Sequence, residues 1–166
     1  QLSAPLRARF GILFRLEMYK PEELAQIVRR SASILEIDAE DAGIMEIARR
    51  SRGTPRIANR MLKRVRDYAQ VRGSGAIDLK TAREALEFFE IDELGLDWMD
   101  IRILETLVQT FRGLETLAAT IGEEAVTLED VYEPYLLQRG LIVRTPQGRM
   151  ATTAAFDHLG MTPPTT

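Results

Sequence analysis

The stretch Gly53-Thr54-Pro55-Arg56-Ile57-Ala58-Asn59-Arg60 predicts the junction between two helices. Glycine ends a helix readily because it adopts left-handed backbone angles, and threonine is a good cap for the helix that follows. Pro55 suits the first helical position, where its missing N–H costs no hydrogen bond. Arg56 then lies in the first turn, where free N–H groups and the helix dipole attract anions. Because a cation opposes the dipole at this end, the stretch favours a phosphate-binding corner over a purely structural one.

A four-helix unit is predicted around this corner, over residues 21–90. Apolar side chains recur there at the spacing of amphipathic helices, and Pro, Asp and Gly residues mark the helix ends. The expected helices are Pro21 to about Leu35, Ala39 to Arg50, Thr54 to about Val71, and a helix capped by Asp78 that runs through Phe89.

A second unit is predicted after residues 91–95, where the composition becomes acidic. Its expected helices run from a cap at Asp97 to Phe111, from Leu114 after Gly113 to about Ile121, and from an N-cap at Thr127 to Arg139. Residues 141–144 and 149–152 then read as two strands around the turn 145–148. Three helices followed by a two-stranded hairpin are typical of a winged helix. The expected fold is therefore mainly α, a four-helix unit followed by a winged helix.

Composition and charge exclude several classes of site. The 166 residues contain no cysteine and one histidine, so disulfides, thiolate chemistry, His-based triads and most metal sites are excluded, and we expect no metal site. Without a long apolar run or a signal-peptide pattern, the expected location is cytoplasmic. Residues 1–91 hold 17 Lys and Arg against 13 Asp and Glu, whereas residues 92–166 hold 5 against 12. Any contact with nucleic acid must therefore come from a local basic tip.

Three motifs in register resemble those of the RuvB family, bacterial ATPases that drive branch migration of Holliday junctions. They are residues 5–11, 53–60 and 144–152. The resemblance covers nearly the whole chain and implies the C-terminal half of such a protein, because the family's P-loop and acidic Mg²⁺ motif belong upstream of Gln1. The chain opens without Met, and residues 10–16 read as an interior strand, so we expect a fragment of a longer protein.

The resemblance also implies a division into domains. Residues 1–18 would end the AAA+ ATPase core and residues 19–91 would form its helical lid. Residues 92–160 would form the winged-helix DNA-binding domain, and residues 161–166 a disordered tail.

For ATP or ADP, the resemblance implies contacts from two subunits. Arg9 resembles the arginine finger that acts in trans on the neighbouring subunit's nucleotide. Arg56 resembles the lid arginine called sensor 2, and Tyr19 resembles the tyrosine that contacts adenine, both in cis. Mg²⁺ would be held by the core upstream. Secondary candidates for contact with the nucleotide are Arg7, Pro55 and Ile57.

The residues alone leave alternatives open at each position. Arg7 and Arg9 can be surface arginines on a solvated loop, and short motifs are weak guides. Arg56 can be tied to a carboxylate, although the dipole argues against a cation there. Tyr19 alone reads more often as a core residue.

Arg144 and Arg149 flank the wing turn, and a hairpin tip would carry both to DNA phosphates or the minor groove. Thr145 and Gln147 could add neutral hydrogen bonds to phosphate. The expected recognition helix is acidic at Glu129, Asp130 and Glu133, so we expect backbone contacts rather than reading of bases in the major groove. A solvated hairpin in a protein-binding winged helix is the alternative.

The resemblance thus implies an ATP-dependent translocase or helicase for Holliday junctions in DNA recombination, repair and the SOS response. Its implied partners are duplex DNA, RuvA through the upstream part, and further copies in a homo-hexameric ring. The chain alone, without a P-loop, is expected not to hydrolyse ATP. The alternative from another class is a non-enzymatic winged-helix adaptor or regulator.

Overall fold

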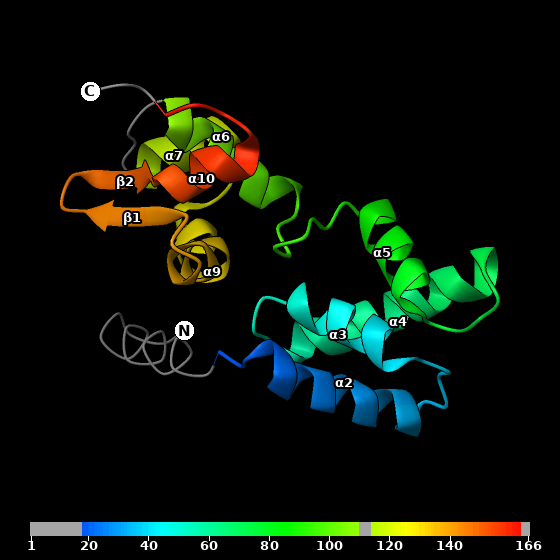
Figure 1. Ribbon diagram of the computed structural model, residues 1–166. Coiled ribbons are helices and arrows are strands. Elements are labelled where there is room, and N and C mark those ends of the chain that lie inside the picture. The colour runs from blue at the N-terminus through cyan, green and yellow to red at the C-terminus, as the bar shows by residue number, and fades with distance from the viewer. Residues whose placement is uncertain (1–17, 110–113, 164–166) are drawn as a thin grey trace. The chain divides into compact units, whose positions relative to one another are not determined.

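A computed structural model describes residues 18–109 and 114–163, and their elements are drawn in Figure 1. The chain divides into two compact units, the first ending at Asp97 and the second beginning at Trp98. The first unit is helical, and the second combines helices with a two-stranded antiparallel sheet. The expected fold class, mainly α with a two-stranded hairpin, is confirmed.

The first unit consists of helices at the positions that the sequence predicts. They are α2 (Pro21–Ile34), α3 (Asp41–Arg49), α4 (Pro55–Arg72) and α5 (Leu79–Phe88). Pro21 and Pro55 begin their helices, where a proline loses no hydrogen bond. Asp78 caps α5, because its side chain accepts a hydrogen bond of 2.7 Å from the Thr81 N–H. Each predicted helix end lies within two residues of the observed one.

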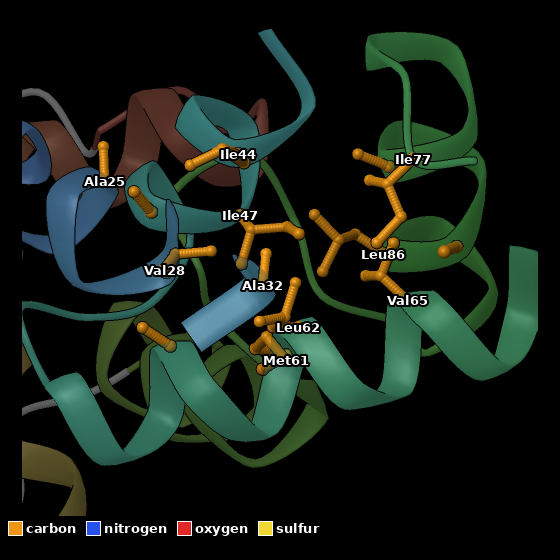
Figure 2. Packing of buried hydrophobic residues seen from close by; sticks show 14 of the residues in the cluster. Ala25, Val28, Ala32, Ile44, Ile47, Met61, Leu62, Val65, Ile77 and Leu86 are labelled. Atoms are coloured by element: carbon orange, nitrogen blue, oxygen red, sulfur yellow. The ribbon is translucent and has the colours of Figure 1, made fainter. Parts of the chain in front are cut away.

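The core of this unit lies between the apolar faces of α2, α3, α4 and α5, and Figure 2 shows its side chains from close by. Ile47, Leu62 and Leu86 come from three of these helices and are fully buried. Truncating one of them to alanine costs about 2–5 kcal/mol in unfolding free energy. This core fixes the end of α3 and the start of α4, and so holds the corner between them.

A buried ion pair joins α3 to the segment that follows α5. Arg50 and Glu46 are both buried and form a salt bridge of 2.8 Å. Arg50 also donates a hydrogen bond of 3.0 Å from Nη1 to the Ile91 carbonyl. Gly95 has a left-handed φ of 82°, and a Cβ at this position would lie 2.6 Å from the Arg50 carbonyl oxygen. The connector 91–95 therefore packs directly against Arg50, the residue that follows α3.

The second unit contains α6 (Trp98–Gln109), α7 (Leu114–Ile121), the strands β1 (Ile142–Thr145) and β2 (Gly148–Ala151), and α10 (Thr153–Leu159). Between α7 and β1 the chain forms α8 (Ala125–Thr127), a π-helical turn η1 (Leu128–Tyr132) and α9 (Glu133–Gln138). Its core includes the fully buried leucines Leu104, Leu117, Leu128 and Leu136. The two strands pair with Arg144 opposite Arg149 and Thr145 opposite Gly148.

Several further expectations are corrected or lie outside the described residues. Thr127 is not an N-cap, because the helical segment begins at Ala125 after an extended Glu124. The predicted continuation of α6 to Phe111 lies outside the described residues, as do the strand expected at residues 10–16 and residues 164–166 of the tail. α10 has no counterpart among the predicted bounds. No helix in the described ranges combines the length and apolar character needed to cross a membrane.

Candidate functional site

The corner before α4 is built from backbone angles that only a few residue types adopt easily. Arg52 and Gly53 are both left-handed, with φ of 58° and 68°. Thr54 is extended, and Pro55 starts the helix. Thr54 occupies the N-cap position, as predicted, but its side chain makes no capping bond and instead donates a hydrogen bond of 3.2 Å to the Arg52 carbonyl. The first-turn N–H groups of α4 are therefore not satisfied by the Thr54 side chain.

Arg56 is exposed in the first turn of α4. It forms no hydrogen bond or ion pair with the residues that the structure describes, so the alternative in which a carboxylate holds it finds no support there. An exposed guanidinium beside N–H groups at a positive helix end is a suitable arrangement for binding a phosphate.

The structure places Tyr19 next to this corner. Its backbone N–H donates a hydrogen bond of 2.9 Å to the Gly53 carbonyl. A Cβ on Gly53 would lie 3.3 Å from the Tyr19 carbonyl oxygen and 3.4 Å from Cβ of Met18. Because Gly53 lacks that atom, residues 18 and 19 can lie against the corner, and the Tyr19 side chain is 40% exposed rather than part of the core. The backbone of Tyr19 is thus fixed to Gly53, three residues before Arg56.

The secondary candidates for contact with the nucleotide differ in where they lie. Pro55 is half-buried at the helix start, next to Arg56. Ile57 is also half-buried, but it packs against the core of the first unit, which accounts for an apolar residue there without any ligand. Arg7 and Arg9 lie outside the described residues, so their predicted roles stay predictions.

Directly behind the corner, the carboxylate of Glu46 is held by arginines. Burial raises the pKa of Glu46, but hydrogen bonds from Arg50 and Arg49 and the charges of these arginines together outweigh that effect, so the pKa lies below its ordinary value of 4.5. Glu46 therefore stays ionised across the physiological range and keeps Arg50 in place. In residues 18–109 and 114–163, no group of three His, Asp or Glu side chains is arranged to hold a metal ion.

The wing arginines, unlike Arg56, are held in place by a carboxylate. Arg144 and Arg149 face each other across the hairpin, one residue pair from the turn, and both bind Glu133, the first residue of α9. Arg144 donates to Oε2 of Glu133 from Nη2 at 2.7 Å and from Nε at 3.2 Å. Arg149 donates from Nε to Oε1, and from Nη2 to Oε2 at 3.3 Å. The Glu133 side chain is fully buried between the two guanidinium groups.

This cluster corrects one interpretation and refines another. Glu133 does not contribute to an exposed acidic surface of the recognition helix, because it is buried against the wing. Thr145 donates a hydrogen bond of 3.1 Å to the Gly148 carbonyl and so closes the turn, whereas Gln147 is exposed at its tip. The sequence did contain a signal for the cluster: two arginines in register across a short hairpin repel each other and need a carboxylate nearby.

Comparison with known proteins assigns both units. Residues 19–92 match a family model described as the RuvB AAA lid domain, and residues 93–160 match one described as the RuvB C-terminal winged helix domain. A structure of Thermotoga maritima RuvB, titled a Holliday junction branch migration motor, is 45% identical with a TM-score of 0.87. A mutant of the same protein is 47% identical with a TM-score of 0.88. Each comparison covers 98% of this chain and 56% of the relative, so the chain spans about half the length of those proteins. The chain, a lid followed by a winged helix, belongs to the RuvB family.

Proposed function

We propose that this chain is the lid and winged-helix part of an ATP-driven DNA translocase that promotes branch migration of Holliday junctions in bacterial recombination and repair. Membership of the RuvB family supports the class of activity. The observation that carries the proposal is the corner where Arg56 is exposed in the first turn of α4 beside Tyr19.

The corner fits one side of a nucleotide. Arg56 and the first-turn N–H groups of α4 would receive a phosphate, and Tyr19 would cover the adenine from the same subunit. The absence of a Cβ at Gly53 leaves room for the backbone of residues 18 and 19. ATP would supply the free energy for movement, and Mg²⁺ would be held by a core that these 166 residues do not contain, because they carry no Gly-x-x-x-x-Gly-Lys-Ser/Thr motif.

Arg9 would act in trans, with Arg7 as a secondary candidate. An arginine that reaches the phosphates of a neighbouring subunit stabilises the charge that develops during phosphoryl transfer. This role requires a ring, and we propose a homo-hexamer of the full-length protein in the bacterial cytoplasm.

The wing would grip duplex DNA through its phosphates. Arg144 and Arg149 would supply the positive charge, and Gln147 at the turn, with Thr145, would add neutral contacts. Such contacts carry little sequence information, which suits a motor that moves along arbitrary DNA. RuvA would bind the part of the protein upstream of this chain.

One observation favours a second candidate, a non-enzymatic winged-helix adaptor. The wing arginines already share one buried carboxylate, and residues 92–166 hold 5 Lys and Arg against 12 Asp and Glu. An adaptor would bind neither ATP nor duplex DNA, so both binding measurements separate it from the motor.

The experiment that tests the motor compares Arg56→Ala with Arg60→Ala in the full-length protein. Arg60 is an exposed arginine one turn further along α4 and is the matched control. We expect Arg56→Ala to lower ATP turnover and branch migration of a synthetic junction by about 10²-fold, as for other groups that stabilise transition-state charge, and Arg60→Ala to leave both nearly unchanged. Equal effects of the two variants would contradict the phosphate corner. Turnover by this chain alone would contradict the assignment of the P-loop to an upstream core.

A further inference from the structure

Glu133 has an unusual environment for a carboxylate on a helix next to a DNA-binding wing. It follows the π-helical turn η1 and begins α9. Its side chain has no exposed surface, whereas those of Arg144 and Arg149 are 31% and 14% exposed. Both of its oxygens accept hydrogen bonds from these arginines. A buried charge is tolerated only when it is paired and hydrogen-bonded in this way.

The hairpin register explains why the carboxylate is needed. Arg144 and Arg149 are direct cross-strand partners, and like charges in that position repel. With Glu133 between them the three side chains carry a net charge of one positive unit. The two guanidinium groups can therefore stay side by side near the tip of the wing.

The hydrogen bonds leave the same part of each arginine unused. Arg144 and Arg149 both bind Glu133 through Nε and Nη2. Within the described part of the chain, Nη1 of each arginine has no hydrogen bond to another residue. A guanidinium group can bind a carboxylate with one edge and a phosphate with another, because its N–H groups point in fixed, different directions.

We propose that Glu133 is a positioning residue for DNA: it binds one edge of each wing arginine and so orients the remaining N–H groups towards duplex phosphates. The inference rests on the proposed contact between the wing and duplex DNA. Phosphates do not displace Glu133, because arginines that left it would leave a buried charge without compensation. Both arginines are instead held in advance, which lowers the entropy cost of binding.

This inference predicts the opposite sign from simple electrostatics. Glu133→Gln removes a negative charge beside the DNA and would tighten binding if charge alone mattered or if Glu133 competed with phosphate. If Glu133 positions the arginines, the same substitution weakens binding. Glu129→Gln is the matched control, because it removes one negative charge from the same helical segment at a half-exposed position that forms no hydrogen bond or ion pair with the wing arginines.

The test measures the affinity of this chain for a labelled duplex of arbitrary sequence by fluorescence anisotropy, between about 50 and 200 mM salt. We expect Glu133→Gln to weaken binding by about 10-fold and to reduce the salt slope by about one, and Glu129→Gln to preserve the slope and bind at least as tightly as the unaltered chain. Binding by Glu133→Gln that equals or exceeds that of the unaltered chain would overturn the inference.

A second variant covers the case in which Glu133→Gln does not fold, which circular dichroism and thermal unfolding would reveal. Glu133→Asp keeps the charge and shortens the side chain by one methylene group, so any loss of affinity in the folded variant comes from geometry. We expect a several-fold loss, and unchanged affinity would overturn the inference. Failure of the unaltered chain to bind duplex DNA is a different result, since it would remove the wing contact itself.

Discussion

The corner before α4 and the tip of the wing both present arginines that we assign to phosphates, but these arginines are restrained to different degrees. At the corner, Arg56 is exposed, and the surrounding backbone makes the site through left-handed residues and a helix N-terminus. At the wing, Arg144 and Arg149 are fixed by a buried carboxylate. A free arginine suits a ligand whose presence changes during a cycle. An arginine that is fixed by a carboxylate suits a binding surface that keeps the same form throughout the cycle.

The largest effect on stability should come from breaking the wing cluster. We expect Arg149→Ala to lower the unfolding free energy by roughly 2–4 kcal/mol, because the buried carboxylate of Glu133 loses one of its two partners and Arg144 remains. Arg56→Ala should change it by less than about 0.5 kcal/mol, as for other exposed residues without contacts. Chemical denaturation of the two variants measures the difference, and equal losses would contradict it. In duplex binding, Arg149→Ala should also reduce the salt slope by about one.

A smaller effect should come from filling the space at Gly53. Gly53→Ala adds a Cβ against Met18 and Tyr19 at a left-handed position, whereas Gly75→Ala meets no atom within 4 Å at a similar φ. Backbone strain should cost both variants about 1–2 kcal/mol, and crowding should add to the loss only at Gly53. The difference between their thermal unfolding curves therefore reports how tightly residues 18 and 19 lie on the corner. Identical curves would mean that this contact contributes nothing.

The smallest expected effect is a loss of stability at acidic pH. In the first unit, Arg50 forms a salt bridge with a buried carboxylate, as the wing arginines do. The pKa of this carboxylate, that of Glu46, is lowered. A lowered carboxyl pKa stabilises the fold above the unfolded pKa, so this stability is lost as the pH falls from about 4.5. Unfolding of the first unit followed over this range should show the loss. Glu46→Gln should reduce the pH dependence but keep the share of Asp78, whose pKa is lowered by the hydrogen bond from the Thr81 N–H.

The first unit could be predicted closely because its signals are local. Amphipathic spacing sets the faces of α2 to α5, and Pro21, Pro55 and Asp78 mark starts for reasons that depend only on the backbone nearby. The corner followed from the same signals. Even there the Thr54 side chain does not cap the helix that it precedes, since its hydroxyl donates to the Arg52 carbonyl instead.

The second unit was less predictable because its decisive contacts are tertiary. Thr127 has the chemistry of an N-cap, yet the chain becomes helical at Ala125 and continues through η1. Local helix propensity does not determine where this helical segment begins. Glu133 reads as a surface acid on a helix, and only the fold brings it between Arg144 and Arg149. The predicted roles of Arg7 and Arg9 await a test.

The seat of Gly95 on the backbone of Arg50 has a mechanical consequence. Arg50 is three residues before Gly53, and it also holds the Ile91 carbonyl. The corner and the connector therefore share the backbone of Arg50 as a common base, so a substitution that displaces one of them should also displace the other.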